Sequence, residues 1–221
     1  MVLESLLRST EFEPVSLLVL RNREAGITHL LQAVPSAVPI YIVEKSVMDA
    51  IAGFPVHRGV LALARRCETA PALRVGDRSV LGIGLANHDN VGGIVRCCAA
   101  FGASALFDET SADPLYRKAI RVSAGAAFNL PHRRSGSADA LIGWLEREGV
   151  VPLALSPSGA TDLRDVDPSR RLALVVGTEG AGLPREIMRR CETARITMAP
   201  GHDSLNVTVA TGIALHALAR R

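Results

Sequence analysis

Apolar and polar positions follow two different patterns along the chain, and the pattern changes near residue 66. Before that point, short apolar runs predict strands at 15–20, 40–43 and 59–64 and a short helix at 45–53. The stretch 65–77 carries charge, proline and glycine in place of an apolar period. We therefore expect a small α/β domain over residues 1–66, a linker over 67–78 and a second domain over 79–221.

The second domain alternates strand-like and helix-like segments. Continuous apolar runs at 151–155 and 172–176 are typical of strands that are covered on both faces. Further strands are predicted at 80–85, 105–107, 126–130 and 195–198, and helices at 90–102, 116–123, 138–148, 183–191 and 205–221. This alternation predicts an α/β fold, with a parallel sheet and helices on both of its faces.

Composition places the chain among folded proteins and excludes few functions. Hydrophobic residues make up 48% and charged residues 21%, which is enough to build a core. No apolar run approaches the roughly 18 residues of a membrane span, and the opening residues do not form a charged-then-apolar leader. The four cysteines form no C-x-x-C pair, so neither a metal site nor a disulfide framework is expected. We expect a cytoplasmic protein.

The charge balance favours a nucleic-acid partner without deciding the matter. The net charge is +3, and only Lys45 and Lys118 among the 25 cationic residues are lysines. The planar fork of arginine suits bidentate contact with phosphate, although an arginine-rich composition can also reflect genomic nucleotide bias. Aromatic residues make up only 4%, which argues against a stacking platform for single-stranded bases.

Residues 87–103 form the first of three segments that carry candidate chemistry. One helix face is an apolar stripe, made of Val91, Ile94, Val95, Cys98 and Phe101. Arg96 falls on the other side, among glycines and alanines that would let a ligand or another backbone come close. Free amides at the helix start near Asn90 suit an anion. The alternative is an arginine on an ordinary solvated helix face.

Residues 174–187 form the second segment, in which a buried strand runs into a glycine-rich turn. Gly177, Gly180 and Gly182 allow sharp turns and close backbone approach to a ligand, and Glu179 could pair with an arginine. An ordinary strand-to-helix turn with a solvated glutamate is the alternative.

Residues 196–218 form the third segment. Ser204 is placed to cap a helix that is apolar or small nearly all the way round. Such a helix is expected to be buried on all sides, in a dimer interface or inside its own domain. Pure capping is the alternative role for Ser204 and Asn206.

Together the three segments resemble the motifs of the SpoU, or TrmH, family of RNA ribose methyltransferases. They read Asn90-Val-Gly-Gly-Ile-Val-Arg96, Gly177-Thr-Glu-Gly-Ala-Gly182 and Ser204-Leu-Asn-Val-Thr-Val-Ala210. Arg121-Val-Ser-Ala-Gly-Ala and Phe128-Asn-Leu-Pro match a family stretch between the first two motifs. The resemblance covers residues 79–221.

The resemblance implies a C-terminal trefoil knot, a homodimer and S-adenosylmethionine held in the knot by backbone groups, without a metal. It gives Arg96 the catalytic role, with supporting functional positions at Asn90, Glu179, Ser204 and Asn206. Its cofactor contacts fall on Leu155, Gly177, Thr178, Ile196, Met198 and Leu205. Arg121 and Arg58 become candidates for contact with the RNA substrate.

The N-terminal region resembles the small ribosomal-protein-like RNA-binding domain of the rRNA-modifying branches of the family. His57-Arg-Gly-Val60 is similar to the stretch that closes that domain, although the lead-in is short and a trimmed domain is expected. The resemblance therefore favours rRNA over tRNA as substrate, for methylation of a ribose 2′-hydroxyl in structured RNA.

Two rival functions remain open from the sequence. One is a catalytically idle RNA-binding protein with the same fold. The other is a dinucleotide-dependent oxidoreductase, because Gly82-Ile-Gly-Leu-Ala-Asn87 approaches G-x-G-x-x-G and Asp108 lies where a ribose-binding acid is expected. The third glycine is replaced by Asn87, and the first two are expected inside the strand, before the turn.

Overall fold

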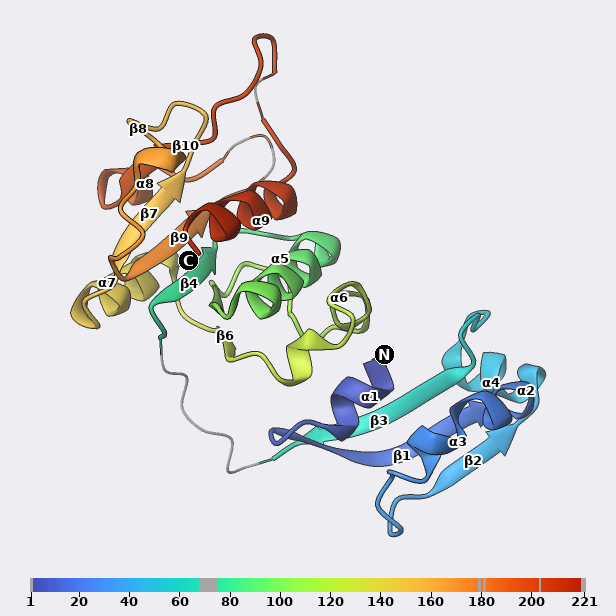
Figure 1. Ribbon diagram of the computed structural model, residues 1–221. Helices are drawn as coiled ribbons and strands as arrows, with labels where there is room; N and C mark the ends of the chain where they lie inside the picture. The colour runs from blue at the N-terminus through green and yellow to red at the C-terminus, as the bar shows by residue number, and fades with distance from the viewer. Residues whose placement is uncertain (1, 68–74, 179, 181, 203, 220–221) are drawn as a thin grey trace. The chain divides into compact units, whose positions relative to one another are not determined.

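The computed structural model describes residues 2–67, 75–178, 180, 182–202 and 204–219. The chain divides into two compact units, Met1–Pro71 and Ala72–Arg221 (Figure 1). In the described part of the chain, every helix is too short or too polar to cross a membrane.

The first unit is a small sheet with helices packed on it. Its elements are α1 (Val2–Leu7), β1 (Phe12–Leu20), α2 (Arg21–Glu24), η1 (Ala25–Ile27), α3 (Thr28–Leu31), β2 (Ile40–Val43), α4 (Lys45–Ala52) and β3 (Val60–Arg66). The described strands have the order β2-β1-β3, with β2 parallel and β3 antiparallel to β1. Leu17 and Val19 are buried on one face and Leu20 packs with Met48 on the other. The predicted strands and the helix of this unit are confirmed, with β1 and β3 longer than expected.

The second unit carries the candidate motifs. Its elements are β4 (Arg78–Gly82), α5 (His88–Phe101), β5 (Ser104–Phe107), α6 (Arg117–Val122), η2 (Ala126–Phe128), β6 (His132–Arg134), α7 (Ala138–Arg147), β7 (Val151–Leu155), β8 (Thr161–Asp162), η3 (Leu163–Asp165), β9 (Leu172–Val176), α8 (Arg185–Arg189), β10 (Glu192–Arg195) and α9 (Val207–Ala217). The described strands form one parallel sheet in the order β6-β5-β4-β9-β7-β10-β8.

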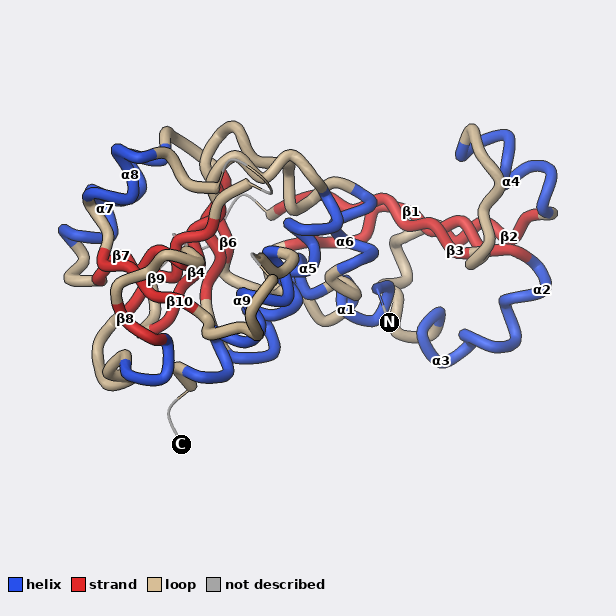
Figure 2. Tube along the Cα trace, turned by 90° about the horizontal axis from the view of Figure 1, so that it is seen from above, coloured by secondary structure: helices blue, strands red, loops and turns tan. Residues whose placement is uncertain are grey.

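Helices cover both faces of this sheet, as the alternation of segments predicted. Side chains of a strand point alternately to opposite faces, so Leu174 packs with α5 and α9 while its neighbour Val175 packs with α7 and α8. Figures 1 and 2 show the two helix layers on either side of the strands. The continuous apolar sequence of β9 follows from this burial, because both of its faces are covered.

Helix α5 is held by a cap at each end and by a buried stripe. Asn87 accepts the N–H of Asp89 at 2.9 Å, and Gly102 ends the helix with φ of +66°. The predicted stripe is buried at Val91, Ile94, Val95 and Cys98, but its last member, Phe101, is 37% exposed. Phe101 lies in the final turn, beyond the reach of the sheet, so the apolar period overestimated its burial.

The uniformly apolar sequence of α9 predicted a helix buried on all sides, and this prediction was wrong. Thr211 and Leu215 face the core, whereas Val209 is 50% exposed and Ile213 is 41% exposed. The helix starts at Val207 with Asn206 as its cap, so the expectation of Ser204 as the cap was wrong. The covered half packs on α5, β9 and η3, and the other half is partly exposed to solvent.

Two predicted strands were misplaced. The apolar run at 126–130 is a single 3₁₀ turn, because Ala124 (φ +55°) and Gly125 (φ +86°) turn the chain just before it. Its buried side chains pack under α5, which gives the same apolar signal as a strand. The strand predicted at 195–198 lies earlier, at Glu192–Arg195, because its partner β7 ends opposite Ala194. Residues 196–198 are therefore loop.

Gly92→Ala is expected to destabilise the protein by about 1–3 kcal/mol, because the added methyl overpacks a backbone contact. A Cβ at Gly92 would lie 2.6 Å from the main-chain oxygen of Ala119 in α6. Chemical denaturation of the wild type and variant measures the difference in the free energy of unfolding.

Gly143→Ala in α7 is the matched control, since it too places alanine at a helix-interior glycine. Its Cβ would lie 3.5 Å from the flexible end of Arg147, an ordinary contact. Higher helix propensity should then stabilise it by about 0.5–1 kcal/mol. Equal destabilisation of both variants would contradict the argument from backbone approach.

Candidate functional site

The three motif segments leave the same edge of the sheet. Strands β4, β9, β7 and β10 stand side by side and run parallel, so their carboxyl ends meet at one edge. The first motif follows β4, the second follows β9 and the third follows β10. Loops at this edge are the usual place for ligands in open α/β sheets. Segments far apart in sequence thereby form one candidate site.

Asn90 and Asn206 join the first motif to the third. Asn206 Nδ2 donates to Asn90 Oδ1 at 3.0 Å, and Asn206 Oδ1 accepts the N–H of Thr208 at 2.9 Å. Thr208 Oγ1 in turn donates to the main-chain carbonyl of Asn90 at 3.3 Å. Asn90 is only 6% exposed. The two asparagines, both expected as functional residues, thus fix the first turns of α5 and α9 against each other.

Gly93 makes this contact between the helices possible. A Cβ at Gly93 would lie 2.5 Å from the methyl carbon of Thr208, and a Cβ at Gly92 would meet α6 as closely. The small residues around Arg96 therefore divide into two groups. The glycines admit neighbouring helices, whereas Ala99 and Ala100 are exposed beside Arg96.

Arg96 lies on the exposed surface of α5, in the half of the helix beyond Asn90. In a single chain, Arg96 therefore lies on a solvated helix face, which is the alternative that the sequence left open. Exposure leaves the guanidinium available to a ligand that approaches α5 from outside.

The glycine-rich turn after β9 is shaped by its own backbone. Gly182 N–H donates to the Thr178 carbonyl at 3.1 Å, and a Cβ at Gly177 would lie 2.7 Å from the carbonyl carbon of Gly182. Gly180 has φ of +90° and Gly182 of +68°, which favour glycine. The turn itself thus requires these glycines. Glu179 lies outside the described residues.

The remaining expected cofactor residues lie at or just beyond strand ends. Leu155 is the last residue of β7 and pairs in register with Ala194, and Ile196 follows β10. Both are half-buried against the core beneath α5 and α9. Met198 is half-buried in the same loop, and Leu205 is 39% exposed just before α9.

The other expected site residues are exposed. Ser204 lies between the loop after β10 and the cap of α9. Arg121 is in the last turn of α6, the helix that packs on Gly92. Arg58 belongs to the first unit, in the turn before β3.

Asp162 is a buried acid near the site that the sequence did not reveal. It is 8% exposed at the end of β8, and its carboxylate accepts from the backbone and guanidinium of Arg164 and from Thr197 Oγ1. Hydrogen bonds from Arg164 and then Thr197 hold the pKa of this carboxyl well below its ordinary value. The charged group therefore stabilises the fold above the unfolded-state pKa, and that contribution is lost as the pH falls through the folded-state pKa.

Asp108 is the acid that the oxidoreductase hypothesis expects to bind a ribose, but its carboxylate accepts hydrogen bonds from within the protein. It is 4% exposed and accepts from Gly84 N–H at 3.0 Å and from Ser111 Oγ at 2.6 Å. Gly84 lies in the turn with φ of +67°, not inside the strand as expected, and Gly82 ends β4. The acid thus fixes the turn after β4 and is not directed toward a ligand.

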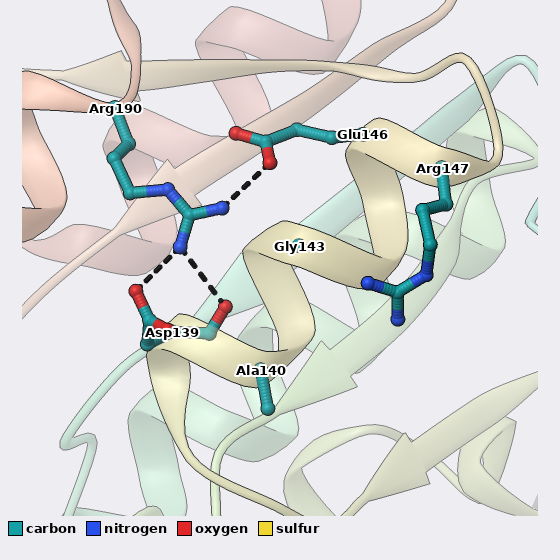
Figure 3. Close-up of a pocket in the computed structure, with 6 residues that line it drawn as sticks. All are labelled: Asp139, Ala140, Gly143, Glu146, Arg147 and Arg190. Atoms are coloured by element: carbon teal, nitrogen blue, oxygen red, sulfur yellow. Dashed lines mark hydrogen bonds and ion pairs between the residues drawn. The ribbon is translucent and has the colours of Figure 1, made fainter.

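An open groove on α7 lies apart from the candidate site. Its lining residues are Asp139, Ala140, Gly143, Glu146, Arg147 and Arg190 (Figure 3). Arg190 from the end of α8 bridges Glu146 at 2.6 Å and Asp139. These charges neutralise each other on the face of the sheet opposite α5. Within the described ranges, no group of three histidine, cysteine or acidic side chains could hold a metal ion.

Comparison with known proteins agrees with the position of the motifs. Residues 78–216 match the model of the SpoU rRNA Methylase family. An uncharacterized tRNA/rRNA methyltransferase of Mycobacterium bovis is 36% identical over 217 residues, which cover 94% of this chain and 75% of that protein.

Two solved structures share the fold. An AdoMet-bound rRNA methyltransferase from Sinorhizobium meliloti is 26% identical with a TM-score of 0.78, covering 98% of this chain and 83% of that one. An RNA 2′-O ribose methyltransferase has a TM-score of 0.80 over 97% of this chain and 83% of that one. At 24% identity, the second likeness shows the fold alone.

Asn206→Ala should lower the free energy of unfolding by about 1–2 kcal/mol, because it removes both the cap of α9 and the bond to Asn90. Asn206→Asp keeps an oxygen for the Thr208 N–H and should cost less than Asn206→Ala. Ser204→Ala is the control and should change stability by less than about 0.5 kcal/mol. Chemical denaturation separates the three. A larger loss for Ser204→Ala than for Asn206→Ala would contradict Asn206 as the cap.

Proposed function

The chain belongs to the SpoU rRNA methylase family, and on that premise we propose that it methylates a ribose 2′-hydroxyl in structured RNA. It is an S-adenosylmethionine-dependent RNA methyltransferase of that family. The observation that carries the proposal is the joining of the first and third motifs through Asn90 and Asn206 at the carboxyl edge of the sheet. The ribose 2′-hydroxyl as the target goes beyond the family assignment and rests on the resemblance of the three motifs to those of RNA ribose methyltransferases.

The cofactor site that we propose follows the ends of three adjacent strands. Its residues are Leu155, Gly177, Thr178, Ile196, Met198 and Leu205. The half-buried Leu155 and Ile196 offer apolar surface for an adenine, and backbone groups beyond the strand ends suit its polar edges. A trefoil knot formed by the segments after β9 and β10, as in the family, is part of this proposal.

When bound, S-adenosylmethionine would supply an activated methyl group for in-line displacement by the ribose oxygen, with S-adenosylhomocysteine as the leaving group and the hydroxyl proton passing to solvent water. The ribose hydroxyl is a weak nucleophile, so its developing negative charge needs stabilisation. A guanidinium with a pKa above about 12 is a poor base. We therefore assign Arg96 to gripping the adjacent phosphate and stabilising that charge, with orientation contributing much of the acceleration. The exposure of Arg96 on α5 is compatible with this role, since RNA would approach from outside.

Exposed cations near α5 support RNA as the substrate. Arg117 and Arg121 lie on the exposed side of α6, which packs on α5 at Gly92, whereas Lys118 pairs with Asp89 of α5 at 2.7 Å. Arginine and lysine at such positions favour phosphate contacts. In the first unit, Arg58 is exposed in the turn before β3 and is our candidate for a second RNA contact. We favour rRNA over tRNA because the small first domain resembles that of rRNA-modifying relatives, and a cytoplasmic enzyme follows from such a substrate.

A homodimer is the proposed assembly. Leu205, Val209 and Ile213 lie at helical spacing with 39–50% exposure, and the ring of Phe101 meets that of His216 at 6.0 Å between centroids. Val209 and Ile213 thus form an exposed apolar stripe on α9, with Leu205 just before the helix and the Phe101–His216 ring pair one turn beyond Ile213. A stripe of this kind is costly to leave in water, and a second copy of the same stripe would cover it.

The first test is transfer of labelled methyl from S-adenosylmethionine to ribosomal and transfer RNA from cells that lack this protein. The wild type is expected to label one RNA class at a single dinucleotide that resists alkaline hydrolysis. Arg96→Ala should lower the rate by about 100-fold or more, because a charge-stabilising donor is lost. Arg147→Ala, which changes an exposed arginine on α7, should retain activity.

Two outcomes would count against parts of this proposal. Near-normal turnover by Arg96→Lys would exclude a role for the planar guanidinium. If neither RNA class is labelled although the cofactor binds, the result would favour the alternative function, a catalytically idle RNA-binding protein that does not methylate these mature RNAs. Label that alkali releases from the chain would place the methyl group elsewhere than the ribose.

Val209→Asp combined with Ile213→Asp should convert the dimer into a monomer, because two charges would be buried in the interface. Light scattering after gel filtration measures the mass against the 23.4 kDa of one chain. Ile51→Asp, at a 65% exposed apolar position of the first unit, is the matched control and should leave the mass unchanged. A wild-type mass of one chain at micromolar concentration would refute the dimer.

A further inference from the structure

Asp162 stands out because a nearly buried carboxylate is joined to the loop that follows β10. Its residue is 8% exposed, whereas the side chain of its arginine partner, Arg164, is 76% exposed. The guanidinium of this ion pair is therefore solvated, while its carboxylate is not. Thr197 Oγ1 is the other side-chain donor to this carboxylate. The carboxylate of Asp162 thus bonds to the loop after β10 and is shielded from solvent.

Residues 156–166, which we call the brace, run beside residues 193–195 of β10. Ser156 N–H donates to the Ala194 carbonyl at 2.9 Å, and Ala160 N–H donates to Thr193 Oγ1 at 3.0 Å. The guanidinium of Arg195 donates to the carbonyls of Gly159 and Ala160, both at 2.9 Å. The brace and β10 therefore behave as one unit, and the bond from Asp162 to Thr197 extends it past the strand end.

Gly159 allows the brace to approach β10 this closely. A Cβ at this position would lie 2.3 Å from the carbonyl carbon of Ala194, a distance that no side chain tolerates. Beyond Asp162, the brace is fixed to the core under α9, since Leu163 is 4% exposed and Val166 is 9% exposed. Asp162 is thus held on both sides and can act as a rigid acceptor.

Thr197 is the residue between Ile196 and Met198, two of the proposed cofactor contacts. Within the described parts of the chain, its bond to Asp162 is the one side-chain hydrogen bond that joins residues 196–202 to another segment. Thr197 itself is exposed, so packing alone does not fix its position. Together with the packing of Ile196 on the core, this bond holds the loop between Ile196 and Met198.

We infer that Asp162 is a positioning residue, which holds the loop at residues 196–198 in the shape that receives S-adenosylmethionine without touching the cofactor. This inference rests on the proposed function, because it takes the loop as part of the cofactor site. It adds a residue outside the three motifs to the machinery. Its effect should fall on cofactor affinity and leave RNA affinity unchanged, since the brace lies beside β10 and away from α6.

Thr197→Val tests the inference with the smallest change, because valine keeps the shape and loses the hydroxyl. Calorimetric titration with S-adenosylhomocysteine should show affinity lowered about tenfold, as expected for losing a hydrogen bond to a charged group. Thr197→Ser keeps the hydroxyl and should bind within about twofold of the wild type. Arg164→Gln removes the exposed partner and should likewise change affinity little. RNA affinity without cofactor should be equal in all four proteins.

The outcomes separate this inference from the proposed function. Wild-type protein that binds S-adenosylhomocysteine, with Thr197→Val binding equally well, would overturn the positioning role alone. Wild-type protein that binds neither S-adenosylhomocysteine nor S-adenosylmethionine would overturn both. Asp162→Ala should weaken binding at least as much as Thr197→Val, and its melting temperature shows whether it folds. If it does not fold, the Thr197 pair still decides.

Discussion

Gly92 lets the backbone of α6, and Gly93 lets the side chain of Thr208, approach α5 more closely than any larger residue would permit, and much of the second unit depends on these two contacts. Gly92 faces Ala119 of α6, and Gly93 faces Thr208 at the start of α9. Both approaches are too close for a Cβ, so a single methyl group at either position would move a helix. Because α5 also lies on the sheet through its buried stripe, these contacts fix α6 and α9 relative to the strands.

The candidate site is a consequence of that arrangement. Once α9 is placed against α5, Asn206 can cap its own helix and also bond to Asn90, so one side chain serves both local and tertiary structure. Two loops at the carboxyl edge are fixed by hydrogen bonds instead. They are held by their own turns, as in the backbone pairing of Thr178 with Gly182, or by a neighbouring segment, as in the bond from Thr197 to Asp162.

The degree of burial separates the charged groups that shape the fold from those that a substrate can reach. Acids with little exposure, such as Asp108 and Asp162, accept several hydrogen bonds and shape turns. Paired surface arginines such as Arg190 neutralise nearby acids. Exposed cations on α5 and α6, Arg96 and Arg121 among them, remain on the surface where a polyanion can reach them. Stability and substrate contact thus draw on different members of an arginine-rich chain.

By itself, the sequence determined the class of fold and the order of the motifs. Continuous apolar runs identify β7 and β9 because strands covered on both faces need no polar positions, and the residues and order of the three motifs carried the family resemblance. Only the tertiary structure decided what each position does. It made the run at 126–130 a buried turn and left half of α9 exposed, because an apolar pattern reports burial without naming the neighbour that provides it. It also joined Asn206 to Asn90 and revealed the bond from Thr197 to Asp162, since both bonds depend on partners distant in sequence that local periodicity does not encode.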